Sequence, residues 1–273
     1  MRKLKDLTEE EKAEIVLKRT NGIKEKDIIK EYNIPERQYH NLLKLSGIKK
    51  RKKIQKHNFN EDYFEKIDTE DKAYFLGFIV ADGNISKDTN CVKIIQKETY
   101  VLYEFKKYIQ FEGEIYTSKN RNISTISISS EKTKKDLHNL GLFSNKTMTV
   151  QYPNVPEHLQ NHFMRGVFDG DGCISIHHDK RDNSDRGQVN ICSGSIEFIN
   201  TYVDNLVKYA NVKRNNIRCP KGTYYLIDWG GLTDVENIYS FFYKDATVFL
   251  ERKKATFDKV VYIHSNKNKY RKK

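Results

Sequence analysis

The sequence predicts an α+β protein that consists of a duplicated unit preceded by a small three-helix domain. Three observations lead to this prediction. Two segments of the 273-residue chain, one ending near Asp82 and one near Asp171, share an apolar pattern and the same terminal residues. A similar order of strand-like and helix-like segments follows each of them. A separate amphipathic helical pattern occupies the first 48 residues, ahead of a run of basic residues.

The N-terminal domain begins with a helix whose first turn has a capping pattern. Thr8 is followed three residues later by Glu11, which predicts a capping box and a helix to about residue 20. Asn21-Gly22 ends this helix, and a second helix runs to Asn33, a residue type that tolerates the left-handed conformation. The apolar positions of the second helix are Ile28, Ile29 and Tyr32.

A third helix is predicted over residues 35–46, with a proline in its first turn. Its apolar face carries Tyr39, Leu42 and Leu43, next to Ile34. The opposite face carries polar candidates for base contacts: Arg37, Gln38, Asn41 and Lys44. This pattern resembles the helix-turn-helix of homeodomain-like and recombinase-type DNA-binding domains. The resemblance implies that residues 35–46 are a recognition helix for the major groove of DNA. The alternative is a small helical domain used for protein contacts.

Positive charge is concentrated at the two ends of the chain, whose net charge is +12. Residues 1–56 contain 17 basic and 9 acidic side chains, residues 251–273 contain 9 and 2, and the middle has a net charge of −3. Each phosphate that a basic side chain neutralises releases counterions, so nucleic acid is the predicted partner. The alternative is that these lysines only keep the protein soluble. Lys50 and Arg51, in the basic linker, are further candidate DNA contacts.

Residues 74–86 and 163–175 carry the duplicated motif. Each has a glycine five residues before an aspartate, Gly77 before Asp82 and Gly166 before Asp171, and each ends in Asp-Gly-x-Ile-Ser. The aspartates are 89 residues apart. After the first motif we predict strand 91–95, helix 100–108, strands 113–117 and 123–129, and helix 132–140. After the second we predict strands 173–177 and 188–192, helix 195–209, strands 216–219 and 223–229, and helix 233–242.

The residue types in the motif indicate a close helix pair and a cation site. A glycine inside a helix costs about 1 kcal/mol relative to alanine, so matching glycines predict that the two motif helices approach each other closely. Ala81 and Gly170, one turn further along, support the same contact. An aspartate at a helix C-terminus faces the negative end of the helix dipole, and a divalent cation would offset this at both motifs. An all-oxygen site of this kind suits Mg²⁺ or another divalent cation such as Mn²⁺. The alternative is that Asp-Gly only ends each helix.

Residues 76–83 and 164–172 resemble the paired motifs of single-chain LAGLIDADG homing endonucleases, and the resemblance covers roughly residues 60–260. It implies two αββαββα units related by pseudo-symmetry, with the motif helices at their interface and two saddle-shaped sheets on duplex DNA. The domain boundaries expected from this are 1–48 for the helix-turn-helix domain, 49–59 for a basic linker, 60–155 and 156–263 for the two repeats, and 264–273 for a basic tail.

The resemblance also implies roles for individual residues. Asp82 and Asp171 would bind the catalytic metal ions, with help from the carbonyl groups of Ala81 and Gly170, and each carboxylate would serve the cleavage of one strand. The earlier acidic position of the motif is Asp169 in the second copy but Val80 in the first, so Asp169 is considered secondary.

Family members often carry a lysine that stabilises the developing phosphate charge. The segments 140–147 and 241–247 resemble the blocks where it lies, so the candidates are Lys146 and Lys244. A surface lysine is the alternative for each. The strands that would face DNA offer candidate contacts: Lys93, Thr125, Ser127, Gln188 and Asn190.

The composition excludes several other classes of protein. Hydrophobic residues make up 37% and aromatic residues 12% of the chain, which is enough for buried cores despite 32% charged residues. No apolar run is long enough for a membrane span, and the N-terminus has no apolar signal segment. The four cysteines lack zinc-ribbon spacing and fit a reducing compartment, so we expect an intracellular, cytoplasmic protein.

These observations together predict a site-specific double-strand DNA endonuclease that acts as a monomer on double-stranded DNA. It would hydrolyse one phosphodiester in each strand with divalent metal ions. Two alternatives remain at this point. One is a DNA-binding transcription regulator of the same fold that does not cleave, and the other is an RNA maturase that helps an intron to fold.

Overall fold

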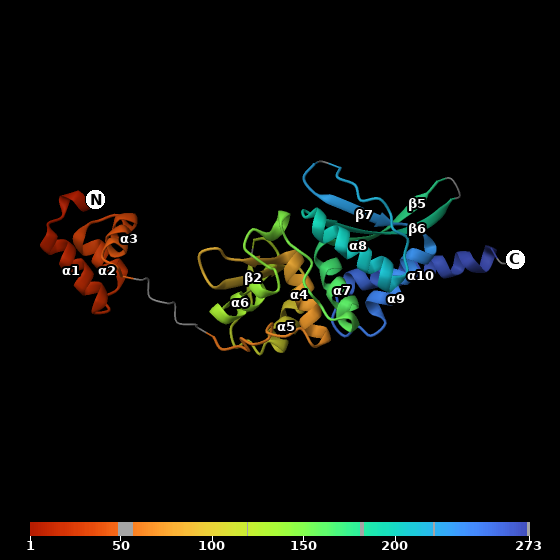
Figure 1. Ribbon diagram of the computed structural model, residues 1–273, viewed down its shortest axis with the longest axis horizontal. Helices are drawn as coiled ribbons and strands as arrows, with labels where there is room; N and C mark the ends of the chain where they lie inside the picture. Colours follow the sequence, from red (N-terminus) through yellow and green to blue (C-terminus); the bar gives the residue numbers. More distant parts are fainter. Residues whose placement is uncertain (49–56, 119, 181–182, 221, 272–273) are drawn as a thin grey trace. The chain divides into compact units, whose positions relative to one another are not determined.

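A computed structural model of the chain describes residues 1–48, 57–118, 120–180, 183–220 and 222–271, the last six of them by their backbone alone. The chain divides into two compact units, Met1–Ile54 and Gln55–Lys273. Figure 1 labels the α-helices of both units and several of the strands; the two units are described separately below. The predicted contacts Lys50 and Arg51 lie outside the described residues.

The N-terminal unit contains the three predicted helices. They are α1 (Glu9–Thr20), α2 (Glu25–Tyr32) and α3 (Glu36–Leu45). The predicted capping box is present, since the Glu11 amide donates to Thr8 Oγ1 at 3.1 Å and the Thr8 amide donates to Glu11 Oε2 at 2.8 Å. Asn33 ends α2 in the left-handed conformation with φ of 48°. The three helices share a buried core that contains Ile15, Ile28, Ile34, Tyr39, Leu42 and Leu43.

The first repeat of the larger unit has the predicted αββαββα order. Its elements are α4 (Glu70–Asp82), β1 (Gly83–Ile85), β2 (Cys91–Gln96), α5 (Thr99–Tyr108), β3 (Tyr116–Ser118), β4 (Ile123–Ser129) and α6 (Glu131–Asn139). The strands form an antiparallel sheet in the order β1-β2-β4-β3. One face of this sheet packs on the core through alternating apolar residues such as Val92, Ile94, Ile126 and Ile128.

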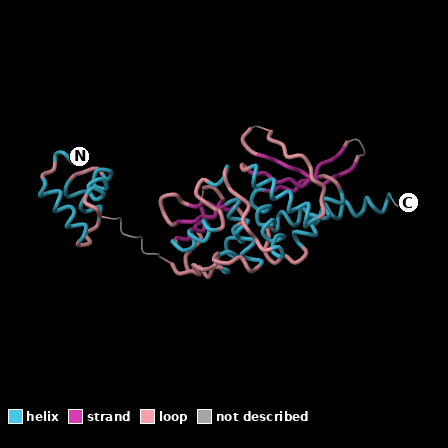
Figure 2. Tube along the Cα trace, viewed as in Figure 1, coloured by secondary structure: helices cyan, strands magenta, loops and turns pink. Residues whose placement is uncertain are grey.

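The second repeat follows the same order with one departure. Its elements are α7 (Gln160–Asp171), β5 (Gly172–Asp179), β6 (Ser184–Ser193), α8 (Ile196–Ala210), β7 (Tyr225–Trp229) and α9 (Leu232–Tyr243). The sheet order is β5-β6-β7, and Figure 2 shows the strands of the two repeats as two separate groups. The predicted strand 216–219 was wrong: among the described residues it makes only an isolated bridge between Arg218 and Leu226. Pro220, which follows it, has no amide hydrogen to extend a ladder.

A long C-terminal helix, α10 (Glu251–Arg271), was not predicted. Its many lysines and arginines make the segment resemble a solvated basic arm. The structure reveals apolar positions on one face, because Phe257 and Val260 are fully buried together with His264. Phe257 packs against Phe168 of α7 and against Tyr239 and Tyr243 of α9, and α10 also contacts β5 and β6.

The two motif helices α4 and α7 pack directly against each other, as the paired glycines predict. A Cβ atom at position 77 would lie 2.1 Å from the carbonyl oxygen of Phe163, and one at position 166 would lie 2.0 Å from the carbonyl oxygen of Tyr74. The backbones are therefore too close for any side chain at these two positions. Each motif glycine faces the backbone of the opposite helix, and this mutual contact joins the two repeats into one core. The predicted α+β fold with a duplicated unit and a preceding three-helix unit is thus confirmed.

Candidate active site

Two aspartates meet where the motif helices end. Asp82 is the last residue of α4, and Asp171 is the last residue of α7. The helix ends touch, since a Cβ atom at Gly170 would lie 2.2 Å from Ala81 Cβ and 3.3 Å from Asp82 Oδ2. Asp82 therefore lies beside Gly170 of the opposite motif, and the site is shared between the two repeats.

The surroundings of Asp82 and Asp171 disfavour the state in which both carboxyl groups are ionised with no cation beside them. Burial raises the pKa of Asp82, while the charges of Lys253 and Lys146 and a hydrogen bond from Gln96 act in the opposite direction. Solvent reaches the side chain of Asp171, but the protein atoms around it and the charge of Asp82 raise its pKa to about 6. Close carboxylates with raised pKa values are typical of a site that binds a cation.

Two buried lysines flank the aspartates. Lys146, in the 3₁₀ turn η2 (Lys146–Met148), donates through Nζ to the carbonyl oxygen of Gly83. Lys253, in the first turn of α10, donates through Nζ to the carbonyl oxygens of Phe168, Asp169 and Gly172 at 2.6–2.7 Å. Gly83 and Gly172 are equivalent positions of the two motifs, so the lysines occupy matching places. Burial lowers the pKa of both lysines, and nearby aspartates oppose that shift.

In the second repeat, the structure places Lys253 beside the aspartates, whereas the predicted candidate Lys244 lies away from them. Lys244 is exposed at the C-terminal end of α9, and the charges that act on the two aspartates are those of Lys146 and Lys253. The resemblance placed the lysine of the second repeat in residues 241–247, the block that matches 140–147. The lysine that reaches the motif helix, Lys253, instead lies beyond that block, in α10.

Gln96 is a site residue that the sequence analysis missed. It ends β2 and donates through Nε2 to Asp82 Oδ2. In the second repeat Ser193 occupies the position of Gln96, and the residue before it, Cys192, donates through Sγ to the carbonyl oxygen of Asp171 at 3.3 Å. The antiparallel pairing of β1 with β2 brings the end of β2 to the end of α4, and this contact is visible only in the structure.

A hollow of about 340 Å³ opens beside the aspartate of the first motif. It is lined by residues of both repeats, among them Asp82 and Gln96 from the first and Gly170, Arg252 and Lys253 from the second. Acidic, amide and basic residues therefore line one space that a phosphate group and a hydrated cation would fit chemically.

The site has the donor types that a hard divalent cation requires. Asp82 and Asp171 offer carboxylate oxygens at adjoining helix ends, and Ala81 and Gly170 precede them with backbone carbonyl groups at the negative ends of the helix dipoles. The raised pKa values of the aspartates indicate that a positive charge beside them would stabilise their ionised forms.

The candidate contacts on the strands lie on the sheet faces that do not pack on the core. Lys93 and Ser127 are exposed and directly opposite each other in the β2–β4 ladder, and Thr125 is half-buried on the same face. Gln188 and Asn190 are half-buried on β6. Gln188 donates through Nε2 to Asp228 Oδ2 at 3.0 Å, so its amide is already oriented by a neighbour on β7.

Three of the four candidate residues on α3 are free for contacts with a partner. Arg37, Asn41 and Lys44 are exposed. Gln38 is different, because it is half-buried and its Oε1 accepts a hydrogen bond from the backbone amide of Leu4. Its side-chain oxygen thus helps to hold the N-terminal segment of this unit.

Comparison with known proteins identifies the fold. No protein-family model matches the sequence, and no curated protein matches it by sequence. Among solved structures, the chain is similar to the LAGLIDADG meganuclease I-AabMI bound to uncleaved DNA, with a TM-score of 0.53 and 17% identity over 71% of this chain and 91% of that one. The homing endonuclease I-LtrWI bound to target DNA has a TM-score of 0.52 and 14% identity, over 76% of this chain and 92% of that one. I-GzeII in complex with its DNA target has a TM-score of 0.53 and 14% identity, over 72% of this chain and 91% of that one. The chain has the LAGLIDADG homing endonuclease fold. Among the described residues, no helix combines the length and apolarity needed to cross a membrane.

Proposed function

We propose that this protein is a site-specific endonuclease that hydrolyses one phosphodiester in each strand of a DNA duplex, using divalent metal ions. The observation that carries the proposal is the pair of aspartates at touching helix ends, flanked by two buried lysines in matching places. Solved structures with the same fold are endonucleases bound to DNA. We expect the protein to act as a monomer, because one chain supplies both motifs.

The metal ions would be held by Asp82 and Asp171 with the carbonyl groups of Ala81 and Gly170, and Mg²⁺ or Mn²⁺ suits these oxygen donors. When bound, such an ion activates water and stabilises the attacking and leaving oxygens of the phosphodiester. Gln96 orients the carboxylate of Asp82. Lys146 and Lys253 hold positive charge where the phosphate gains negative charge.

Sequence choice would come from both units. The residues proposed to contact DNA are Arg37, Asn41, Lys44, Lys93, Thr125, Ser127, Gln188 and Asn190. Arginine and asparagine side chains match base edges in the major groove, whereas lysines contact phosphates or guanine.

The test is selection of bound duplexes from a randomised DNA pool, followed by incubation of the selected duplexes with Mg²⁺, Mn²⁺ or a chelator. We expect cleavage of both strands at one position, only with a divalent ion. Selective binding without cleavage would instead indicate a DNA-binding regulator. Binding of a structured RNA in preference to every duplex would indicate a maturase.

The two buried lysines should be needed for cleavage, and Lys244 should not. We expect Lys146→Met and Lys253→Met each to slow cleavage by about 10²-fold or more, because a preorganised charge at the phosphate is removed. Lys244→Met is the matched control and should cut like the parent. Single-turnover rates measured with saturating enzyme test this. Equal slowing in all three variants would contradict the assignment of Lys253.

The N-terminal unit should increase the affinity for DNA and select base pairs at one flank of the cleavage site. Deleting residues 1–54 should flatten the salt dependence of binding by about 0.9 for each phosphate that the protein no longer neutralises. Asn41→Ala in the full chain should cost about 1–3 kcal/mol of binding and relax the choice of one base pair. Lys26→Ala, an exposed change on α2, is the control. An unchanged salt slope and footprint after the deletion would mean that this unit serves another partner.

A further inference from the structure

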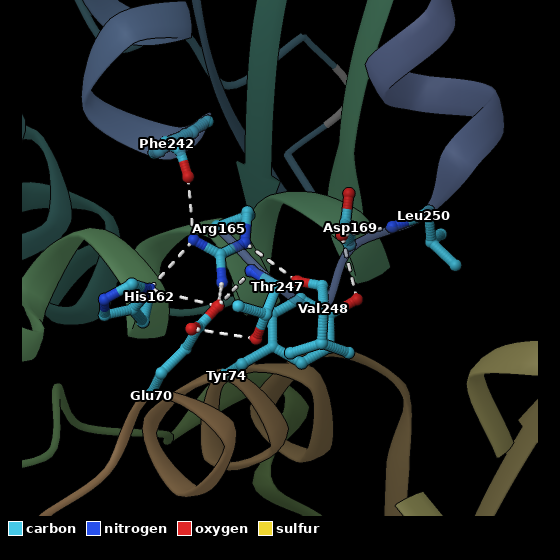
Figure 3. Close-up of polar contacts among 9 residues, drawn as sticks. All are labelled: Glu70, Tyr74, His162, Arg165, Asp169, Phe242, Thr247, Val248 and Leu250. Atoms are coloured by element: carbon cyan, nitrogen blue, oxygen red, sulfur yellow. Dashed lines mark hydrogen bonds and ion pairs between the residues drawn. The ribbon is translucent and has the colours of Figure 1, made fainter. Parts of the chain in front are cut away.

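The second repeat contains a buried polar network that begins at Asp169. The Asp169 side chain is almost fully buried, and its Oδ2 accepts hydrogen bonds from the Tyr74 hydroxyl at 2.9 Å and from the Leu250 backbone amide at 2.8 Å. Figure 3 shows these groups converging from α4, α7 and the segment that precedes α10. The other carboxylate oxygen, Oδ1, has no hydrogen-bond partner among the described residues. Within that part of the chain the Asp169 carboxylate therefore accepts hydrogen bonds only from Tyr74 and the backbone of Leu250, and the charges of Lys253 and Arg165 act on it as well.

The same segment is held at its other end by Arg165. This fully buried arginine donates to the carbonyl oxygen of Val248 at 3.0 Å and to Glu70 Oε1 at 2.8 Å (Figure 3). Glu70 in turn accepts a hydrogen bond from the backbone amide of Thr247 at 2.7 Å. Residues 247–250 are thus fixed to both motif helices by charged side chains.

The segment leads directly to Lys253. The carbonyl oxygen of Leu250 accepts from the Lys253 backbone amide at 3.0 Å, so Leu250 defines the first turn of α10. Lys253 Nζ then donates to the carbonyl oxygens of Phe168, Asp169 and Gly172. Leu250 therefore links the two side chains, because its amide binds the Asp169 carboxylate and its carbonyl oxygen accepts from the turn that carries Lys253.

The first repeat has no counterpart of this carboxylate. The position that matches Asp169 is Val80, which cannot accept a hydrogen bond, and the position that matches Tyr74 is Phe163, which cannot donate one. Lys146 reaches Gly83 from a 3₁₀ turn and not from a helix. The two lysines are thus placed by different means.

We propose that Asp169 is a positioning residue: through its hydrogen bonds to Tyr74 and Leu250 it holds Lys253 at one of the two cleavage sites and leaves Lys146 unaffected. The expected effect on cleavage rests on the proposed endonuclease function, whereas the placement of Lys253 by Asp169 can be tested without DNA.

The geometric test is reductive methylation of the lysines in the full-length protein, followed by peptide mass spectrometry. In the parent, Lys146 and Lys253 are both buried and should react slowly. Asp169→Val removes both hydrogen bonds and should speed modification of Lys253 by about 10²-fold, at about tenfold for each hydrogen bond removed, with Lys146 unchanged. Tyr74→Phe removes one hydrogen bond, preserves the packing and should speed it by about tenfold.

Asp169→Asn is the conservative variant, because its amide oxygen can still accept both hydrogen bonds and its nitrogen replaces the unpartnered oxygen. It should keep Lys253 as protected as in the parent. Val203→Ala, a buried change on α8, controls for general loss of stability. The proposal is overturned if Asp169→Val leaves Lys253 protected, if it exposes Lys146 equally, or if Asp169→Asn exposes Lys253 as much as Asp169→Val does.

The consequence for cleavage is specific to one strand. With end-labelled duplexes, Asp169→Val should slow by about 10²-fold the same strand that Lys253→Met slows, and should leave the strand that depends on Lys146 within a few-fold of the parent. The nicked duplex would then accumulate. Equal slowing of both strands, or slowing of the Lys146 strand, contradicts the proposal. If the parent cuts no DNA, the proposed function fails, while the methylation result still decides whether Asp169 positions Lys253.

Discussion

Asp82→Asn and Asp171→Asn should each abolish double-strand cleavage and leave DNA affinity within a few-fold of the parent. Each carboxylate is proposed to hold metal at the ends of the touching helices, and an amide is a much weaker ligand for a hard cation. We expect a decrease of at least about 10²-fold in the cleavage rate. Because the surroundings raise the pKa of both carboxyl groups, neutral asparagine should not destabilise the fold.

The measurement compares cleavage and binding of the same selected duplex, with melting temperature as a check on folding. Asp204→Asn, an exposed change of the same type on α8, is the matched control and should cut like the parent. Cleavage of both strands at the parent rate in either aspartate variant would refute the metal assignment. Loss of binding together with cleavage would show that the aspartates serve the fold or the DNA contact instead.

Gly77→Ala or Gly166→Ala should lower both the melting temperature and the cleavage rate. Even one methyl group would lie about 2 Å from a backbone carbonyl oxygen of the opposite helix, so the two helices must separate. Overpacking of this kind costs about 1–3 kcal/mol or more of folding free energy. Because both aspartates end these helices, a shift of about 1 Å should also slow cleavage by about 10²-fold.

Gly230→Ala provides the control, since a Cβ atom there would have only the Gly187 carbonyl oxygen nearby, at 3.9 Å. It should melt and cut nearly like the parent. Thermal unfolding and single-turnover cleavage of the three variants decide the point. A Gly77→Ala protein with parental stability and rate would mean that the helix contact does not set the position of the aspartates.

The sequence predicted the two helices that carry the aspartates, because the pattern that marks them is local and occurs twice. Glycine five residues before aspartate is typical of a helix that packs closely and then ends, and its repetition at Gly166 favoured this interpretation over coincidence. The capping box at Thr8 and the left-handed residue Asn33 were predictable for the same reason, since each depends on neighbours within a few residues.

The features that the sequence did not predict depend on contacts far apart in the chain. Lys253 lies on a charged helix, and its role depends on carbonyl groups more than 80 residues earlier. Gln96 becomes a site residue only through the register of β2. Asp169 was considered secondary because its motif partner is Val80, whereas its partners in space are a tyrosine of the other repeat and a backbone amide at position 250.

The contact between α4 and α7 has an evolutionary consequence. The two helices meet through backbone atoms at Gly77 and Gly166, so the contact requires glycine at these two positions. Sheet positions outside this contact can then change independently in each half without moving the helix ends. Because both halves belong to one chain, neither must mirror the other. The sheets differ at equivalent positions, where Lys93 lies opposite Ser127 on one and Asn190 lies opposite Asp228 on the other. Under the proposed function, a chain built in this way would be free to adapt to a target without palindromic symmetry.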